Sequence, residues 1–266
     1  MKELLALPRE WVTATGEIAS FAGHVVRDVW GLRVLRFAGE ALRQAGILIV
    51  GSTLIIWALV FIVGLSTCGI EGAYFLQAQG APSYTGVFTA LCDLREAVPY
   101  AFGYMMSAKV GTGIVAELGA MRISEEIDAL EVMGFDSMTF LCGTRLLAAW
   151  IVLPFMYVVG IAVAYLASYI AVVLQIGSVS AGGYLLAFWE FQSPPDLLFS
   201  LIKGMSMATT IVLVGCYYGY NASGGPIGVG AATAKSMVLN LVLVTLIGML
   251  GTQIFWGTNP RVPIGG

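Results

Sequence analysis

The chain has 266 residues, of which 58% are apolar and only 11% are charged, and its formal net charge is −3. Together with a mean hydropathy of +0.87, this composition excludes an ordinary soluble domain and predicts a protein that is solvated largely by lipid. The few basic residues give no indication of a nucleic-acid partner.

Residues 1–43 precede the first long apolar run and are predicted to form an N-terminal cytoplasmic or interfacial helical segment. Charged residues interrupt this segment, so it lacks the compact apolar core of a signal peptide and the N-terminus is expected to be retained. Apolar residues recur along it at helical spacing: Trp11, Ile18, Ala22, Val25, Val29 and Leu32. We interpret it as an amphipathic helix lying in the headgroup plane; a helix packed on another protein is the alternative.

Residues 44–266 are predicted to form a single membrane domain with five spans, because a helix of roughly 20 apolar residues crosses a bilayer. The spans cover approximately residues 46–66, 97–116, 146–174, 197–220 and 237–256. The second span is the weakest: Lys109 lies inside it and Arg95 and Glu96 stand at its start, so it must face protein or water. After the third span, the apolar stretch that follows Gly183 is too short to cross. The predicted fold class is therefore all-α membrane protein.

The distribution of basic residues predicts the orientation. They are Lys2, Arg9, Arg27, Arg33, Arg36 and Arg43 before the first span, Arg122 and Arg145 between the second and third, and Lys235 between the fourth and fifth. The loops on the other side hold no Lys or Arg, and only Arg261 follows the fifth span. Because cytoplasmic loops are enriched in Lys and Arg, we expect the N-terminus inside and the C-terminus outside.

A short acidic helix is predicted on the cytoplasmic side between the second and third spans, with Ser124 as its N-cap and Gly134 at its end. Its charged edge and its narrow apolar edge could dock in a groove of a partner. The residues assigned to this contact are Ser124, Glu125, Glu126, Ile127, Asp128, Leu130, Glu131 and Met133. The alternative is a solvated loop helix that satisfies its own caps.

Three charged residues at membrane depth, Arg95, Glu96 and Lys109, are the candidate residues of a substrate pathway, because an ionisable group there is costly and often functional. Mutual neutralisation is the alternative, and Lys109 could pair with Glu117 or with another helix.

The cysteines show no metal-ligand spacing and are interpreted as packing residues. They are Cys68, Cys92, Cys142 and Cys216. A disulfide between Cys68 and Cys92, which flank an external loop, stays open. The segment GAATAKS at residues 230–236 lacks the glycine that a phosphate-binding loop requires before its lysine. We expect no catalytic residue and no metal site.

Several segments resemble the MlaE/YrbE permeases of Mce-type lipid transporters. They are LREAVP at residues 94–99, GTGIVAELGAMRISEEIDALEVMGFD at 111–136, CGTRLLAAWIVLP at 142–154 and KGMSMATTIVLVGCYYGYNASGGPIGVGAATAKSMVLN at 203–240. The ending GTNPRVPIGG is similar to the actinobacterial branch.

The resemblance implies a multi-pass permease subunit of an ABC transporter in the bacterial inner (plasma) membrane. Its expected partners are a second, related but non-identical permease, a cytoplasmic ABC ATPase dimer and external Mce substrate-binding proteins. The acidic helix would be the coupling helix seated in the ATPase. This chain would bind no cofactor, since ATP and Mg belong to the ATPase, and the cargo would be a hydrophobic lipid of the fatty acid, mycolic acid or sterol class, moved by import.

The sequence departs from the family pattern at two places. The family commonly reads Arg-Glu-Leu-Gly-Pro where this chain has Arg95 to Pro99 with Ala97 and Val98 in the middle, and it commonly has Arg at Lys109. Loss of a bidentate grip on phosphate at Lys109 argues against a demanding phospholipid headgroup site. The alternatives are an ion-coupled secondary transporter of a hydrophobic or amphipathic solute, which needs midplane carboxylates and internal repeats, and a structural scaffold with a vestigial pocket.

Overall fold

The computed structural model describes the backbone of residues 2–258 and the side chains of residues 16–258. Every regular element in the described range is a helix. The chain divides into two compact units, each made of three pieces of chain. Unit 1 comprises Met1–Leu48, Lys109–Ile151 and Thr209–Asn240, and unit 2 comprises Ile49–Ala108, Val152–Ala208 and Leu241–Gly266. The predicted boundary at residues 43 and 44 stays a prediction.

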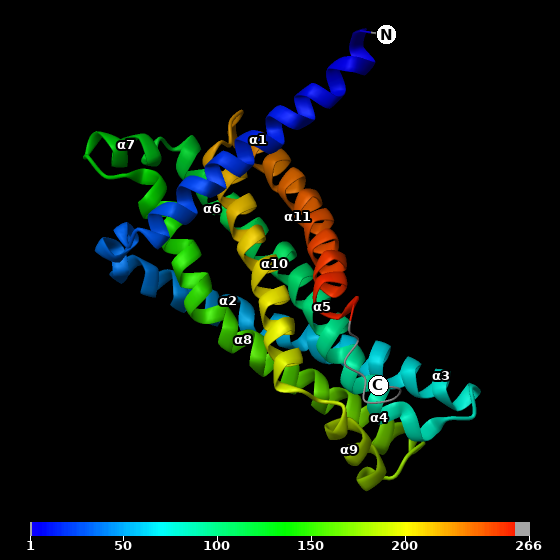
Figure 1. Ribbon diagram of the computed structural model, residues 1–266. Helices are drawn as coiled ribbons and strands as arrows, with labels where there is room; N and C mark the ends of the chain where they lie inside the picture. The colour runs from blue at the N-terminus through cyan, green and yellow to red at the C-terminus, as the bar shows by residue number, and fades with distance from the viewer. Residues whose placement is uncertain (1, 259–266) are drawn as a thin grey trace. The chain divides into compact units, whose positions relative to one another are not determined.

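Four long helices, all labelled in Figure 1, each begin in one unit and end in the other. They are α2 (Ala38–Val63), α8 (Thr144–Tyr169), α10 (Pro194–Tyr220) and α11 (Gly225–Trp256). Their sequences are almost free of charge, and a helix satisfies every backbone hydrogen bond internally, as a segment inside lipid must do. Pro194 suits the first position of α10, where a backbone N–H would have no partner within the helix.

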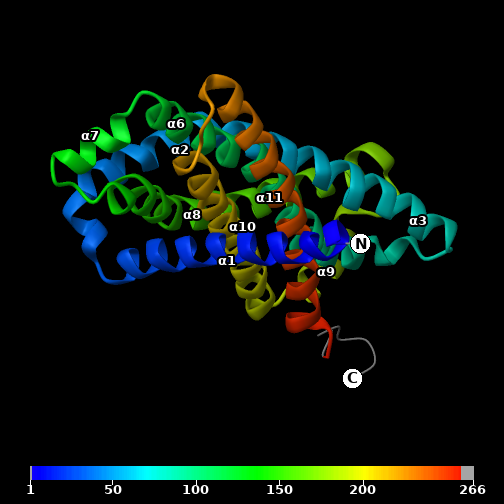
Figure 2. The same cartoon turned by 90° about the horizontal axis from the view of Figure 1, so that it is seen from above.

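Unit 1 also holds the N-terminal helix and the acidic helix. Its further elements are α1 (Lys2–Trp30), η1 (Arg33–Phe37), α6 (Thr112–Ile123), α7 (Glu126–Val132) and η6 (Thr139–Gly143). Figure 2 shows α1 as one continuous helix. Val25 and Val29 on its predicted apolar face are buried, whereas Leu32 is exposed. Leu32 leaves that face because α1 ends at Trp30 and Leu32 itself turns the chain with a left-handed φ of 59°. The side chain of Trp11 lies outside the described residues.

Unit 2 contains short helices and several π-helical segments. These are η2 (Gly64–Glu71), α3 (Gly72–Ala78), η3 (Pro82–Tyr84), α4 (Thr85–Cys92), η4 (Asp93–Ala97), α5 (Val98–Met105), η7 (Ile170–Ile176) and α9 (Ala181–Glu190), with η5 (Met106–Gly111) continuing into unit 1. Figure 1 shows α3, α4 and α9 grouped together, and α4 packs against both of the others. Tyr184 and Phe188 of α9 are buried in this group against Ala90 of α4.

Four helical segments in the described part are long and apolar enough to cross a membrane. They are Arg33–Ala78, Thr139–Ile176, Pro194–Tyr220 and Gly225–Trp256. Four of the five predicted spans are thus confirmed by length and composition. The second predicted span is helical through α5, η5 and α6 but does not belong to this set, because Lys109 and its Ser, Thr and Gly neighbours lower its hydropathy. That span stays a prediction.

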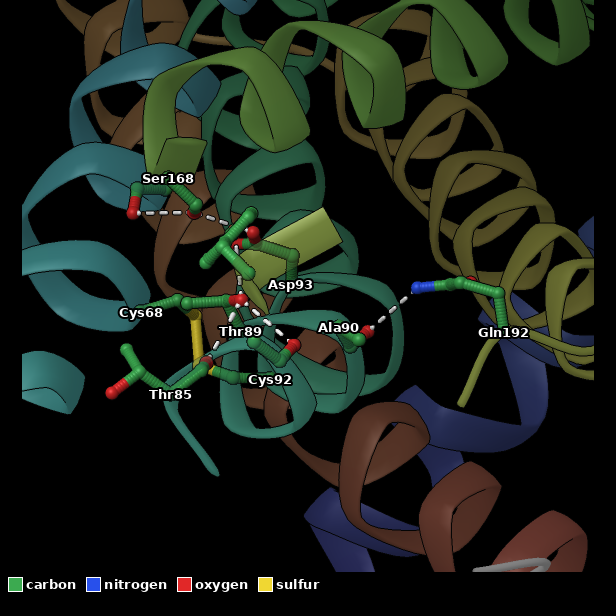
Figure 3. Close-up of a disulfide and its surroundings, with 11 residues drawn as sticks. Cys68, Thr85, Thr89, Ala90, Cys92, Asp93, Ser168 and Gln192 are labelled. Atoms are coloured by element: carbon green, nitrogen blue, oxygen red, sulfur yellow. Dashed lines mark hydrogen bonds between the residues drawn. A yellow bond between two sulfur atoms is a disulfide. The ribbon is translucent and has the colours of Figure 1, made fainter. Parts of the chain in front are cut away.

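The cysteines divide into two kinds. Cys68 of η2 and Cys92 at the end of α4 form a disulfide, so the pairing that the sequence left open is made (Figure 3). Cys142 and Cys216 are free and buried, as packing residues are expected to be.

Candidate functional site

The acidic helix is present in unit 1 as α7, but its predicted N-cap is wrong. Ser124 ends α6, and its hydroxyl lies 3.0 Å from the carbonyl of Ala120 and 2.9 Å from the Glu126 carboxylate. Glu125 occupies the N-cap position with a left-handed φ of 60° and no side-chain cap. Only these two residues separate α6 from α7, and the hydroxyl of Ser124 bonds to the last turn of α6 instead of capping α7.

The predicted end of α7 at Gly134 is confirmed. Gly134 has a φ of 81°, a conformation that glycine adopts without steric cost. The N–H groups of Phe135 and Gly134 donate to the carbonyls of Leu130 and Glu131, the paired bonds that close a helix with a left-handed glycine.

The apolar residues of α7 do not share one exposed edge. Ile127 is fully buried and Leu130 is half-buried, so both stabilise unit 1 rather than face a partner. Met133 is 63% exposed, and Val132, which the sequence analysis did not single out, is 89% exposed. Val132 and its neighbour Met133 are therefore the exposed apolar residues at the end of α7.

The charged residues of α7 also divide into two groups. Asp128 pairs with Arg122 at 2.5 Å. The carboxylate of Glu131 accepts hydrogen bonds from Ser137 (2.6 Å) and from Tyr220 (3.0 Å). These two hydrogen bonds lower the pKa of the Glu131 carboxyl below its ordinary value, and the bond from Ser137 has the larger effect. Among the predicted acidic contacts, Glu125 and Glu126 remain exposed and without an ion pair to a described residue.

Two tyrosines at the end of α10 connect α7 with α1. Tyr220 binds Glu131, and the hydroxyl of Tyr217 donates to Glu17 of α1 at 3.1 Å. The ring of Phe21 packs on both tyrosines, with centroids 5.6 and 6.1 Å away. A cavity of about 450 Å³ opens beside Tyr220, between α1 and the loop after α7. Any displacement of α7 must therefore act on α10 and α1.

A second group of polar residues lies in unit 2, where η4 begins with two of the predicted charges. Arg95 is buried, and its guanidinium donates to Asp196 of α10 at 2.8 Å. Asp196, only 1% exposed, also accepts from the indole of Trp256 at 3.0 Å. The Arg95 guanidinium lies 5.2 Å from the centre of the Trp256 ring, a favourable cation–π distance.

Lys203 of α10 lies at the centre of this group of polar residues. Its buried ammonium group donates to the carbonyl of Arg95 (2.8 Å), to the carboxylate of Glu96 (3.0 Å) and to the hydroxyl of Thr252 (2.8 Å). These three bonds use all the donors that an ammonium group has. The hydroxyl of Thr252 donates in turn to the other oxygen of Glu96 at 2.6 Å.

Glycines of α11 make room for the side chains beside Lys203. A Cβ at Gly248 would lie 2.4 Å from the ring of Tyr100, and that ring is 5.0 Å from the Lys203 ammonium group. A Cβ at Gly251 would press on the aliphatic stem of Lys203 at 3.2 Å. A larger residue at either position would displace part of the cluster.

The charge cluster, defined as Arg95, Glu96, Asp196 and Lys203, holds two cations and two anions and is neutral overall. Three of its side chains are buried, and that of Glu96 is 41% exposed. The mutual neutralisation left open for Arg95 and Glu96 is thus observed, with partners on α10. Glu96 is therefore the member of the cluster that is accessible from outside the protein.

The structure does not bring Lys109 into an ion pair with any described residue; it is exposed. Glu117 pairs with Arg145 at 2.9 Å instead of with Lys109. Sequence reasoning missed Asp196 and Lys203. Lys203 is the lone lysine of the predicted fourth span. Because a charge at membrane depth is costly and often functional, its position in the sequence could have identified it.

Comparisons with known proteins identify the family. The family model described as Permease MlaE matches residues 41–254. A probable ABC transporter permease protein of Rickettsia bellii is 30% identical over 176 residues, 66% of this chain and 68% of the relative. A probable ABC transporter permease protein of Synechocystis is 26% identical over 205 residues, 74% and 78% of the two chains. The chloroplast protein Trigalactosyldiacylglycerol 1 of Arabidopsis thaliana is 27% identical over 175 residues, 64% of this chain and 49% of that protein. Since the family match covers most of its length, the chain belongs to the MlaE permease family.

Proposed function

We propose that this chain is the membrane-spanning permease subunit of an ABC transporter that moves hydrophobic lipids, and that ATP and Mg are bound and ATP is hydrolysed by a separate subunit. The family and the names of the relatives support the permease role. The observation that carries the coupling role is α7, a short helix between two spans that presents Val132 and Met133 outward while Glu131 is bonded to the end of α10.

In this proposal α7 is the coupling helix. Closure of an ATPase dimer would press on the exposed face of α7, and the bonds from Tyr220 and Ser137 to Glu131 would pass the movement to α10. The same helix, α10, also carries Lys203 of the charge cluster. Movement of the end of α10 would therefore be passed along this helix toward the cluster.

The expected cargo is a lipid of the fatty acid, mycolic acid or sterol class, and the expected direction is import. One feature of the charge cluster supports a polar group on the cargo: Glu96 is half-exposed beside the buried Lys203, so a carboxylate or hydroxyl of the cargo could replace Glu96 as a hydrogen-bond partner. Arg95, which Asp196 holds, would position Glu96 rather than contact the cargo. Lys109, exposed in the predicted second span, stays a candidate pathway residue.

The expected surroundings follow the resemblance and the charge distribution. We place the chain in the bacterial inner (plasma) membrane, with the N-terminus cytoplasmic and the C-terminus external, next to a related but non-identical second permease, an ABC ATPase dimer and external Mce substrate-binding proteins. The absence of Lys and Arg from the predicted external loops supports this orientation. Arg261 and the C-terminal tail lie outside the described residues.

The test is a charge reversal on the exposed face of α7. The double variant Glu125→Lys/Val132→Glu alters two exposed side chains, and Glu190→Lys at the exposed end of α9 is the matched control. ATPase co-purification, ATP hydrolysis and labelled-lipid uptake are measured in membranes with equal permease levels. We expect all three to fall in the double variant and none in the control. Unchanged uptake that follows an ion gradient instead of ATP would replace this proposal with a secondary transporter.

A further inference from the structure

Asp93, the first residue of η4, lies beside the disulfide of unit 2 and takes no part in the charge cluster. It follows Cys92 directly, and its side chain is completely buried. Figure 3 shows it between the disulfide and Ser168, a residue of α8. A buried carboxyl at this place needs a partner that offsets its loss of water.

The hydrogen bonds around Asp93 are too few for a carboxylate. One carboxyl oxygen lies 2.5 Å from the hydroxyl of Ser168, and the other has no hydrogen-bond partner. The same hydroxyl lies 3.0 Å from the carbonyl oxygen of Gly64. A serine hydroxyl has one hydrogen to donate. Both contacts are satisfied when protonated Asp93 donates to Ser168 and Ser168 donates to Gly64.

Within the described residues, no cation pairs with Asp93. Arg95, on the same segment, pairs with Asp196, and Lys203 pairs with Glu96. Tyr165 and Tyr184, which lie close enough to interact with Asp93, carry no basic group, and Glu71 of η2 is exposed. Burial therefore raises the pKa of the Asp93 carboxyl well above its ordinary value.

We propose that Asp93 is a proton-binding site: its carboxyl holds a proton while unit 2 is packed and releases it to water when the packing of η2, η4 and α8 opens. The ligand is the proton, and the binding groups are the Asp93 carboxyl, the Ser168 hydroxyl and the Gly64 carbonyl. This site goes beyond the proposed function, since it depends neither on the cargo nor on the ATPase.

Proton binding makes the packing of unit 2 depend on pH. In the packed state the carboxyl is neutral, whereas in an opened state it titrates near the ordinary aspartate pKa of about 3.9. The packed state therefore binds one more proton than the opened state over the interval between the two pKa values. Within that interval, each pH unit of increase shifts the equilibrium toward opening by up to about tenfold.

The disulfide supplies a reporter of this opening, because Cys68 is fully buried and Cys92 is half-buried, so opening of unit 2 exposes both sulfurs further to a reductant. We would measure the rate at which tris(carboxyethyl)phosphine reduces the Cys68–Cys92 disulfide in the purified complex. The pH is varied from about 6 to about 9, well above the ordinary aspartate pKa of about 3.9. Each rate is divided by the rate at which the same reagent reduces oxidised glutathione at the same pH, so that the reagent's own pH dependence cancels.

Two variants distinguish an effect of the Asp93 carboxyl from an effect of another carboxyl close to the disulfide. Asp93→Asn keeps a neutral donor toward Ser168, and Glu71→Gln removes an exposed carboxyl from the same disulfide-bearing helix η2. We expect the normalised rate to rise with pH in the wild type and in Glu71→Gln, by up to about tenfold per unit, and to stay flat in Asp93→Asn. A flat wild-type profile, or an equal slope in Asp93→Asn, would overturn the proposal.

A second measurement covers the case in which Asp93→Asn fails to assemble. Infrared spectroscopy of the wild-type complex at neutral pH should show the carbonyl band of a protonated carboxylic acid, which Ser168→Ala should shift because that variant removes its hydrogen-bond partner. Absence of the band in the wild type, or a band that Ser168→Ala leaves unmoved, would refute the site.

Discussion

Removal of either cation of the charge cluster should destabilise the protein, but by different amounts. Arg95→Met leaves Asp196 buried without its cation, and breaking a buried ion pair on one side costs about 3–5 kcal/mol. Lys203→Met leaves Glu96, whose side chain is 41% exposed and can be hydrated, so the same change should cost about half as much. The structure therefore predicts an order: Arg95→Met is the more destabilising variant.

A double-mutant cycle tests the origin of this difference. Asp196→Asn removes the stranded charge and keeps an acceptor for the Trp256 indole, so it should restore about 2 kcal/mol or more to Arg95→Met. Unfolding free energies would be measured by titration with sodium dodecyl sulfate in mixed micelles, with far-UV circular dichroism as the signal. Equal losses in Arg95→Met and Lys203→Met, or no rescue by Asp196→Asn, would refute the assignment of the buried charge.

Three further predictions concern α7 and the disulfide. Tyr220→Phe removes one hydrogen bond to Glu131, worth about 1 kcal/mol, so amide hydrogen exchange in α7 should become about fivefold faster. An unchanged rate would show that this bond does not hold α7 in place. Because the lowered pKa of Glu131 favours its ionised form in the folded state, its contribution to stability is present above the ordinary carboxyl range and is lost as pH falls through the folded pKa. The protection of the α7 amides against exchange, corrected for the intrinsic exchange rate at each pH, should fall with acid in the wild type but not in Glu131→Gln. Paired Cys68→Ser and Cys92→Ser substitutions, at a separation of 24 residues, should lower the unfolding free energy by about 3 kcal/mol, and dithiothreitol should destabilise the wild type only.

The sequence was sufficient for the features that depend on composition or on local spacing. Uncharged apolar runs predicted four spans, and Gly134 predicted the end of α7, because a left-handed terminal residue is strongly biased toward glycine. The second predicted span failed the same composition test, since Lys109 lies within it. Ser124 was misassigned because two helices compete for the same turn, and a pattern of cap residues does not say which helix the hydroxyl serves.

The partners of the buried charges could not be read from the sequence. Arg95 and Asp196 are separated by 101 residues, and Lys203 and Glu96 by 107, so only the packing of α10 and α11 on η4 brings them together. The exposure of Val132 was also hidden, because its apolar character alone favours burial. Orientation on a helix that is seven residues long depends on the contacts of Ile127 and Glu131, which are tertiary.

The disulfide has a consequence for the maturation of the protein. Cys68 and Cys92 lie in different helical segments, so their bond requires that η2 and α4 approach each other and that the thiols meet an oxidant. Reduction of that bond removes a covalent link within unit 2, so a reducing environment leaves the folded permease less stable than the oxidised protein.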